Sequence, residues 1–450
     1  MSFEAVIGLA LVAGLIACAP VTMAAILLAA FLLHAYCRLI LGGYTVPLQL
    51  PQHRLPSSAS LRHRRSRSPS KAPRREPDGK SEKPLIVVTG GAGMLGFTVA
   101  RQLVETNAYD VEVVDIAPPS PARRLSAVRT YHVIDIAHAG DSRLDIIFAG
   151  AAAVVHTAGI VDLTADSGRT FNAHVVGSWN VLEAAERCGL CAAVVTSSIG
   201  AVTSPYVAYS QADLPADYLP PGFADGTFPY HSSYGATKLE AERSALARDR
   251  PGFRVCALRM PMIFGLEDPM VVAPLLSGLL DRVPDVAGAP LVEFCYVENA
   301  AAAHVRALQA LMEHKPSNKG ATAPRIGGRA FNVTNGDKAQ SAFALWDSLA
   351  RKAASRQKAL RRPLPHIKPL KRLPFAALFV VACISELVFA LCCGHVPRRR
   401  ATFWNLTRAS LRLSGTTVTQ SMVATREELG FVPEFGTLEA FDHMLLQWKG

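Results

Sequence analysis

Short apolar runs alternate with longer segments of helical spacing between residues 84 and 200. The runs are rich in Val, Ile and Ala and predict β-strands at 85–89, 111–115, 131–135, 153–156 and 192–196. Helical spacing follows the first run, at 94–104, and precedes the last, at 175–185. This alternation predicts an α/β fold built on a doubly wound parallel sheet with helices on both faces. In such sheets, ligands bind at the carboxyl ends of the strands.

Residues 5–37 form an apolar segment without a charged side chain. One membrane span needs about 20 apolar residues, so the segment predicts an N-terminal membrane anchor within residues 1–40. Pro20 leaves open whether this is one kinked span or two short ones. A cleaved signal peptide is the alternative, but Glu4 is the charge that precedes the apolar core, where signal peptides carry positive charge.

A second apolar segment covers residues 375–396 and contains Glu386. Basic residues flank it on both sides, and Lys and Arg are enriched in cytoplasmic flanks. If both flanks stay in the cytosol, the segment does not cross the membrane. Residues 374–396 are therefore predicted to form a re-entrant or interfacial membrane-associated helix. An ordinary buried helix is the alternative.

The net charge of +11 is concentrated beside the apolar segments. Residues 38–83 hold 11 Lys and Arg against three acids, and residues 351–372 hold nine and no acid. This distribution indicates membrane-flanking charge and no nucleic-acid partner. A chain that is 50% hydrophobic and 18% charged is not mostly disordered. The Pro-, Ser- and Arg-rich stretch 41–83 is nevertheless predicted to be a basic disordered linker on the cytosolic side.

The nine cysteines are too scattered for a disulfide framework. Cys188 and Cys191 form a CxxC pair, but no second pair accompanies it. Small thiols at a helix end are therefore predicted in place of zinc or redox chemistry, and no metal site is predicted.

The segment TGGAGMLG, residues 89–96, follows the first predicted strand and opens the first predicted helix. Gly90 permits a tight turn, Gly93 lets the backbone approach a pyrophosphate, and Gly96 lets the helix pack on the strand. The helix start at Met94 and Leu95 then offers amide donors and the positive end of the helix dipole. These features predict a dinucleotide-binding Rossmann-like domain over residues 84–259.

Asp115 ends the second predicted strand, 19 residues beyond Gly96. A carboxylate at this position accepts hydrogen bonds from the adenosine ribose and repels a 2′-phosphate, which favours NAD. Arg123 and Arg124 lie nearby in the sequence and could pair with a 2′-phosphate, so NADP remains an alternative cofactor. The alternative is that Asp115 only caps a turn.

Thr196, Ser197 and Ser198 end the fifth predicted strand, and Tyr234 and Lys238 follow within a helical pattern. Residues four apart share one face of a helix, and an ammonium beside a phenol lowers the phenol pKa. Tyr234 is therefore the predicted general base for an alcohol, assisted by a serine hydroxyl that bonds the substrate oxygen. A nicotinamide would accept the hydride.

Over roughly residues 85–449 the chain resembles the extended short-chain dehydrogenase/reductase family. The resemblance rests on the glycine motif, TSS, YxxxK, VVHTAG at 154–159, VVGSWNVLEAA at 175–185 and LRMPMIFG at 258–265. Within that family the chain is most similar to the 3β-hydroxysteroid dehydrogenase group, which includes the sterol-4α-carboxylate 3-dehydrogenases. This similarity rests on VEFCYVENAAAAH ending at His304, AFNVTNGD from Ala330, and ISELVFAL in the second apolar segment.

The resemblance implies roles for the catalytic residues. Tyr234 would be the general base, and Lys238 would lower its pKa and hold the nicotinamide ribose. Ser198 would orient the 3β-hydroxyl, with Ser197 the less favoured candidate.

The resemblance also implies the cofactor contacts. Asp135 and Ile136 would flank the adenine, and Ala158 would line the cofactor site. His174 stands where the group usually has Asn, and this change bears on a hydrogen bond between the central helix and a strand. His156 is expected to be structural or near the cofactor, and His304 to be a packed surface histidine.

The function implied is a membrane-bound oxidoreductase that oxidises the 3β-hydroxyl of a lipid-soluble steroid or sterol with NAD or NADP. Loss of a 4α-carboxylate as CO2 would follow where the substrate carries one. Residues 260–450 would form a smaller substrate-binding region. A homodimer is compatible with this interpretation. The location implied is the endoplasmic reticulum membrane, with the catalytic domain facing the cytosol. The alternatives are a nucleotide-sugar epimerase, dehydratase or other carbonyl reductase of the same superfamily, and a non-catalytic dinucleotide-binding membrane sensor.

Overall fold

A computed structural model describes the greater part of the chain beyond Lys83. The described residues are 83–137, 142–161, 167–203, 211–219, 233–266, 268, 272, 282–285, 290–313, 326–360, 371–391, 411 and 415–447. The predicted anchor (1–40) and the predicted linker (41–83, apart from Lys83 itself) lie outside them.

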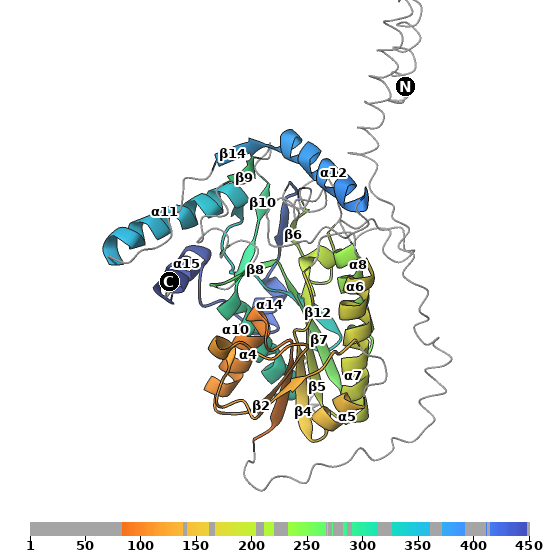
Figure 1. The fold of residues 1–450 in the computed structure, drawn as a ribbon. Coiled ribbons are helices and arrows are strands. Elements are labelled where there is room, and N and C mark those ends of the chain that lie inside the picture. The colour runs from red at the N-terminus through yellow and green to blue at the C-terminus, as the bar shows by residue number, and fades with distance from the viewer. Residues whose placement is uncertain are drawn as a thin grey trace, which may run out of the picture. The chain divides into compact units, whose positions relative to one another are not determined.

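A seven-stranded parallel sheet forms the centre of the fold, in the order β12-β7-β5-β4-β1-β2-β3 (Figure 1). Its strands are β1 (Leu85–Thr89), β2 (Asp110–Asp115), β3 (Thr130–Val133), β4 (Ala151–His156), β5 (Ala192–Ser198), β7 (Arg254–Met260) and β12 (Arg329–Asn332). The parallel sheet confirms the predicted Rossmann-like α/β fold. Because the strand order reverses direction between β1 and β4, the carboxyl ends of these two strands border a crevice suited to a ligand.

Helices cover both faces of this sheet, as Figure 1 shows. One face carries α4 (Met94–Glu105) and α10 (Val297–Glu313), which pack on each other and on the strands. The other face carries α5 (Arg143–Phe148), α7 (Gly177–Arg187) and α8 (Ser233–Leu246). Burial of Val, Ile, Leu and Ala from strands and helices holds the layers together, at about 25 cal/mol for each Å² of apolar surface removed from water.

Two of these elements come from beyond residue 260. Strand β12 pairs with β7, so that Phe331 lies beside Leu258. Helix α10 covers β5 and β7. The sheet therefore draws on chain far beyond the five strands that hydrophobic periodicity predicted.

Strand ends also differ from the prediction in small ways. The third strand ends at Val133 and not at residue 135, because the Asp135 carboxylate accepts a hydrogen bond from the Ala137 N–H and turns the chain. The fifth strand runs to Ser198, so Ser197 and Ser198 both lie on the sheet.

The remaining elements build the C-terminal part and the connections. A second sheet has the order β13-β10-β15-β6, and two strand pairs are β11-β8 and β14-β9. Their bounds are β6 (Gln211–Leu214), β8 (Met262–Phe264), β9 (Arg282–Asp285), β10 (Leu291–Val292), β11 (Phe294–Tyr296), β13 (Gln340–Ser341), β14 (Lys371–Pro374) and β15 (Val418–Gln420). The helices and helical turns are η1 (Pro121–Arg123), α6 (Ser167–Phe171), η2 (Asn172–Val176), η3 (Ile199–Ala201), α11 (Ala342–Leu360), α12 (Phe375–Leu391), α14 (Val423–Glu427) and α15 (Thr437–Gln447).

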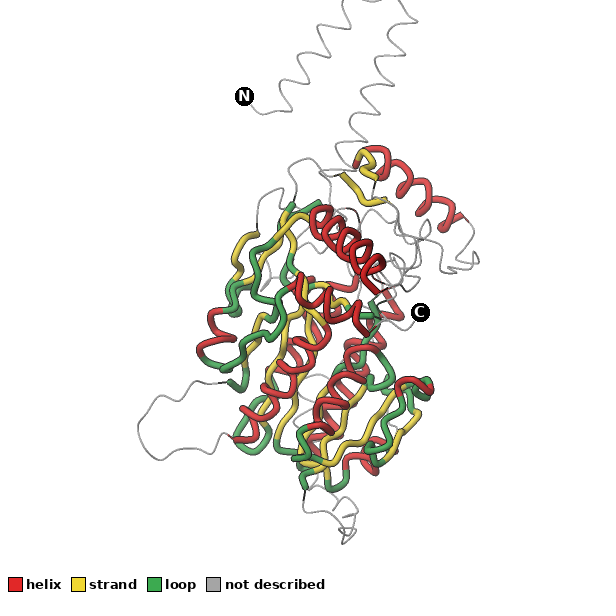
Figure 2. Tube along the Cα trace, turned by 90° about the vertical axis from the view of Figure 1, so that its left-hand side faces the viewer, coloured by secondary structure: helices red, strands yellow, loops and turns green. Residues whose placement is uncertain are grey.

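Helix α12 covers residues 375–391 of the second apolar segment. It lies at one end of the described part of the molecule in space, as Figure 2 shows. Phe379 and Ala382 are buried near Leu411, whereas Val380 and Ile384 are 57% and 51% exposed. Within the ranges described above, no helix combines the length and the apolar character that a membrane span needs.

Candidate active site

The glycine turn between β1 and α4 is closed so tightly that side chains are excluded from it. Gly90 has φ +76°, a left-handed conformation that favours glycine, and a Cβ there would lie 2.6 Å from the Ala158 nitrogen. A Cβ on Gly96 would lie 2.2 Å from the Gly90 carbonyl oxygen. Gly93 donates its N–H to that same oxygen at 3.0 Å and caps the helix. The turn thus brings bare backbone to the crevice between β1 and β4.

Helix α4 begins at Met94, so Met94 and Leu95 belong to its first turn. Amide groups in a first helical turn lack partners within the helix, and together with the dipole they bind anions. Asp115 at the end of β2 faces the glycine turn, where its carboxylate accepts the Ala92 N–H at 2.9 Å. Arg123 donates to the Ala92 carbonyl at 2.8 Å. A carboxylate and a guanidinium therefore border the same turn.

The other predicted cofactor residues lie around the same crevice. Ala158 follows β4 and lies against Gly90. Asp135 and Ile136 follow β3, and Ile136 packs against Gly177. The Ile136 carbonyl accepts from the Asn180 side chain at 2.9 Å, which fastens this loop to α7.

Ser198 and Tyr234 meet at the carboxyl end of β5. A Cβ on Gly200 would lie 3.4 Å from the Ser198 hydroxyl oxygen and 3.6 Å from a ring carbon of Tyr234, so the two side chains are neighbours. The Ser198 oxygen accepts the Gly200 N–H at 3.1 Å. Burial raises the pKa of Tyr234 above its usual value of 10.0, and the Ser198 side chain lowers it in part.

Lys238 lies one turn after Tyr234 on α8 and is 8% exposed. Its ammonium donates to the Thr196 carbonyl at 3.2 Å, and burial lowers the pKa of Lys238 to about 8, against an opposing effect of the Glu242 carboxylate. The expected lowering of the Tyr234 pKa by Lys238 is not among the effects that set that pKa here.

Ser197 has a different environment from Ser198. It is 3% exposed and donates to the Glu242 carboxylate at 2.5 Å. Glu242 in turn forms a buried ion pair with Arg259, whose nearest contact is 2.6 Å. Arg259 also donates to the carbonyls of Ala216 and Tyr218. Ser197 is thereby committed to a structural network, and removal of one member of such a buried pair costs about 3–5 kcal/mol.

The network of Ser197, Glu242 and Arg259 was not predicted from the sequence, although the spacing along α8 gives one indication of it. Glu242 stands four residues after Lys238, as Lys238 stands four after Tyr234, so all three share a helix face. Arg259 gave no comparable signal, because its partners lie in other elements.

His304 was wrongly predicted to lie on the surface. It has no exposed surface and bonds the Thr196 hydroxyl at 2.8 Å through Nε2, while Nδ1 bonds the Ala300 carbonyl at 2.7 Å. Burial lowers the pKa of His304 to about 4. The neutral ring therefore links α10 to the residue whose carbonyl holds Lys238.

His156 at the end of β4 is also buried. It bonds the hydroxyls of Thr89 at 2.6 Å and Ser178 at 2.8 Å. Burial, and next the charge of Lys238, lower the pKa of His156 to about 3. The structure places it beneath the cofactor crevice as a neutral bridge between β1, β4 and α7.

The CxxC cysteines have the environment of ordinary thiols. Burial raises the pKa of Cys188 to about 11 and also raises that of Cys191. Cys188 donates to the Asp145 carbonyl. Raised thiol pKa values disfavour the thiolate that redox chemistry and metal binding require.

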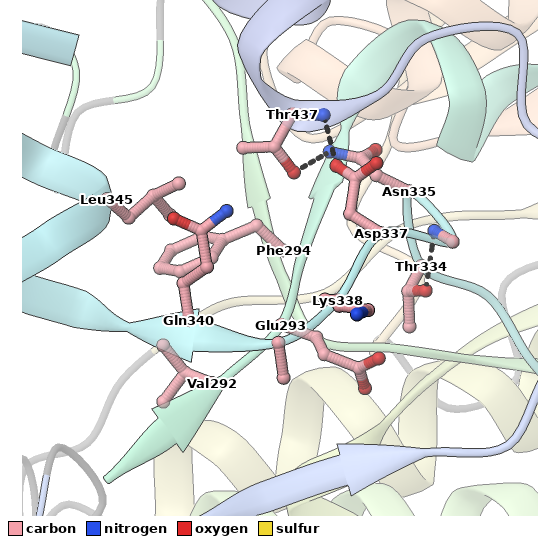
Figure 3. A pocket seen from close by; sticks show the side chains of 12 residues that line it. Val292, Glu293, Phe294, Thr334, Asn335, Asp337, Lys338, Gln340, Leu345 and Thr437 are labelled. Carbon is pink, nitrogen blue, oxygen red and sulfur yellow. Dashed lines mark hydrogen bonds between the residues drawn. The ribbon is translucent and has the colours of Figure 1, made fainter. Parts of the chain in front are cut away.

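A polar pocket lies in the C-terminal part of the chain, shown in Figure 3. It is lined by Val292, Glu293, Phe294, Thr334, Asn335, Gly336, Asp337, Lys338, Ala339, Gln340, Leu345 and Thr437. Asn335 donates to the Thr437 hydroxyl at 3.0 Å, and Asp337 accepts the Thr437 N–H. Burial raises the pKa of Glu293 to about 7, and its carboxyl group accepts the Gln420 N–H at 2.6 Å. These bonds brace β15 and α15.

The residues around the crevice fit a nicotinamide dinucleotide. The glycine turn leads directly into the first turn of α4, whose free amides can bind a pyrophosphate. Asp115 lies where a ribose acceptor is needed, and Ser198, Tyr234 and Lys238 stand at the end of a neighbouring strand, beside Gly159 and Gly200. A proton acceptor and a hydroxyl donor thus lie at the same edge of the sheet as the glycine turn.

Comparisons with known proteins agree with this geometry. The model of a family described as the 3-beta hydroxysteroid dehydrogenase/isomerase family matches residues 87–365. The 3beta-hydroxysteroid-dehydrogenase/decarboxylase isoform 1 of Arabidopsis thaliana is 24% identical over 381 residues, 80% of each chain. The decarboxylating sterol-4-alpha-carboxylate 3-dehydrogenase of Schizosaccharomyces pombe is 28% identical over 261 residues, 56% of this chain and 69% of that protein.

Solved structures show the same fold. The UDP-glucuronic acid 4-epimerase from Bacillus cereus in complex with NAD has a TM-score of 0.53 and 17% identity. The match covers 80% of this chain and 97% of that chain. At this identity the likeness concerns the Rossmann fold and no particular substrate.

Proposed function

The chain belongs to the 3-beta hydroxysteroid dehydrogenase/isomerase family, and from this premise we propose that it oxidises the 3β-hydroxyl of a steroid or sterol to a ketone. It is an NAD(P)-dependent dehydrogenase acting on CH–OH groups. The observation that carries the proposal is that Ser198 and Tyr234 are neighbours at the carboxyl end of β5, with Lys238 one helical turn after Tyr234.

The side chains divide the work on the alcohol. Ser198 holds the substrate oxygen by a hydrogen bond, and Tyr234 takes the hydroxyl proton onto its phenolate oxygen. A bound nicotinamide ring supplies the hydride acceptor. Lys238 provides a positive charge, one helical turn from Tyr234, that favours the phenolate. The burial of Lys238 keeps its charge poorly screened by water and therefore effective.

We propose that the substrate carries a 4α-carboxylate. The Arabidopsis relative is named a dehydrogenase/decarboxylase and the yeast relative a decarboxylating sterol-4-alpha-carboxylate 3-dehydrogenase. Oxidation at carbon 3 would turn such a substrate into a β-keto acid. The carbon–carboxylate bond then breaks, its electron pair forms an enolate with the ketone, and CO2 leaves. The enolate takes a proton from water at carbon 4, which restores the ketone.

We also propose a membrane location, which would suit a lipid-soluble substrate. The uncharged stretch 5–37 is proposed as an anchor, and the endoplasmic reticulum is the proposed membrane. Helix α12 is proposed to lie at the membrane interface, because Val380 and Ile384 present apolar surface away from its buried side.

NAD is proposed as the preferred cofactor, and Asp115→Ala tests this preference. Loss of the bond to the Ala92 N–H loosens the glycine turn and weakens both cofactors. Loss of the carboxylate removes a ribose acceptor for NAD but also removes repulsion of the 2′-phosphate of NADP. The variant should therefore lose more affinity for NAD than for NADP, measured by cofactor titration.

Asp110→Ala is the matched control, because Asp110 lies at the other end of β2 and pairs with Arg129. It should leave both affinities unchanged. An equal loss of NAD and NADP affinity in Asp115→Ala would count against the ribose contact.

The function is tested with full-length, detergent-solubilised protein and NAD. The panel contains a 3β-hydroxysterol with a 4α-carboxylate, the same sterol without it, its 3α-epimer and UDP-glucose. Formation of reduced nicotinamide and of CO2 with the first substrate is expected, and no reaction with the 3α-epimer. Turnover of UDP-glucose alone would support a sugar-nucleotide enzyme instead, and NAD binding without any turnover would support a sensor.

A further inference from the structure

The π-helical turn η2 places His174 where three parts of the active site meet. Turns of this kind are rare and occur frequently at functional sites. The ring of His174 is 1% exposed. It contacts the backbone after β4, the catalytic helix α8 and the ring of Tyr234.

Two ring nitrogens tie the backbone after β4 to the catalytic helix. Nδ1 lies 2.9 Å from the hydroxyl oxygen of Thr237, which stands between Tyr234 and Lys238 on α8. Nε2 lies 2.9 Å from the Ile160 carbonyl oxygen and 3.2 Å from the Ile160 nitrogen. Ile160 is two residues beyond Ala158, which borders the glycine turn. One imidazole thus joins the cofactor side of the site to the proton-transfer side.

The ring is neutral in this position. Burial, and next the charge of Lys238, lower the pKa of His174 to about 2. A neutral imidazole has one donor and one acceptor. The Thr237 hydroxyl also donates to the Tyr234 carbonyl at 3.1 Å, and the Ile160 N–H lies 3.2 Å from Nε2. Each ring nitrogen therefore has a hydrogen-bond partner in either neutral tautomer. Both nitrogens are satisfied without a second positive charge beside Lys238.

The same ring also limits the movement of the phenol. The His174 and Tyr234 rings are 5.3 Å apart with an interplanar angle of 83°, an edge-to-face contact. Gly200 lies against Tyr234 from another element, because a Cβ on it would be 3.6 Å from a ring carbon. Rotation of the phenol away from Ser198 would have to displace one of these neighbours.

We propose that His174 is a positioning residue for the dehydrogenation: it fixes the direction of the Tyr234 phenol and the backbone at Ile160 through one hydrogen-bonded imidazole. The predicted change in kcat rests on the proposed function, whereas the predicted change in backbone amide exchange does not.

The test compares His174→Phe with His174→Gln. Phe keeps an aromatic ring beside Tyr234 but loses both hydrogen bonds, whereas Gln keeps one donor and one acceptor. His174→Phe should lower kcat by about 10–100-fold, because small misplacements of a catalytic group cost about that much. The substrate KM should change by less than about threefold, since no substrate contact is removed. His174→Gln should recover at least about fivefold of the lost kcat.

His443→Gln is the matched control. His443 on α15 bonds the Tyr296 hydroxyl at 3.0 Å, so the change removes a histidine hydrogen bond elsewhere in the fold. Its kcat should equal that of the wild type. A wild-type kcat in His174→Phe, or a His174→Gln variant no better than His174→Phe, would overturn the proposal.

Amide hydrogen exchange gives a measurement that needs no substrate. The segment 157–161 should exchange faster in His174→Phe than in the wild type and should be unchanged in His443→Gln. Unchanged exchange in His174→Phe would refute the tie to Ile160. If the wild type oxidises no sterol, the proposed function fails while this exchange result still decides the role of His174.

Discussion

Replacement of Tyr234 by Phe should abolish alcohol oxidation while leaving NAD affinity nearly unchanged. The phenol oxygen is the proposed proton acceptor and stands beside Ser198, and loss of a general base typically costs about 10²–10⁴-fold in rate. The ring itself remains, so its edge contact with His174 and the shape of the site are preserved. The measurements are kcat for the sterol and Kd for NAD.

Tyr109→Phe serves as the control for loss of a tyrosine hydroxyl. Tyr109 directly precedes β2, at the amino end of the sheet and away from the predicted catalytic residues. This variant should keep wild-type kcat. If Tyr234→Phe turned over substrate at the wild-type rate, Tyr234 would not be the base, and the catalytic assignment of the whole site would fall with it.

Gly96→Ala should remove NAD binding and destabilise the fold. The added methyl group would lie 2.2 Å from the Gly90 carbonyl oxygen and 2.6 Å from the Thr157 hydroxyl oxygen. The first of these is backbone, so relief requires α4 to move away from the turn. Overpacking of this kind costs about 1–3 kcal/mol. NAD affinity should fall at least about tenfold, because the pyrophosphate cradle opens. Titration with NAD and denaturant unfolding measure the two effects.

Gly189→Ala is the control, because it replaces a glycine without creating the steric clash expected in Gly96→Ala. Gly189 has φ +74°, and nothing lies within 4 Å of the place its Cβ would take. It should cost about 1 kcal/mol through backbone strain with unchanged NAD affinity, since it precedes β5 at the amino end of the sheet. Wild-type NAD affinity in Gly96→Ala would mean that the turn is not the cradle.

Local patterns were sufficient to predict the elements that carry the chemistry. Gly90, Gly93 and Gly96 follow a buried strand directly, so the turn is encoded within a few residues. The pairing of Ser198 with Tyr234 could also be expected, because the carboxyl ends of parallel strands share one edge of a sheet. The two side chains are neighbours in the structure, and their catalytic roles stay a prediction.

Contacts between distant segments could not be predicted in the same way. Thr196 and His304 are 108 residues apart in the chain, and no periodicity connects them. Arg259 meets Glu242 only because β7 and α8 pack together. A buried histidine and a surface histidine look alike in an Ala-rich helix, so the burial of His304 depends on which face of α10 meets the sheet.

β12 and α10 are synthesised after the predicted catalytic residues, and this order affects folding during translation. When the ribosome has released the chain up to Met260, Ser198, Tyr234 and Lys238 have all been synthesised. Strand β7 would still present an open edge, the usual starting point for aggregation, and the face that α10 later covers would be bare. The nucleotide-binding layer can therefore close only after Asn332 has emerged, so the nascent polypeptide must protect an unfinished sheet for some 70 residues of translation.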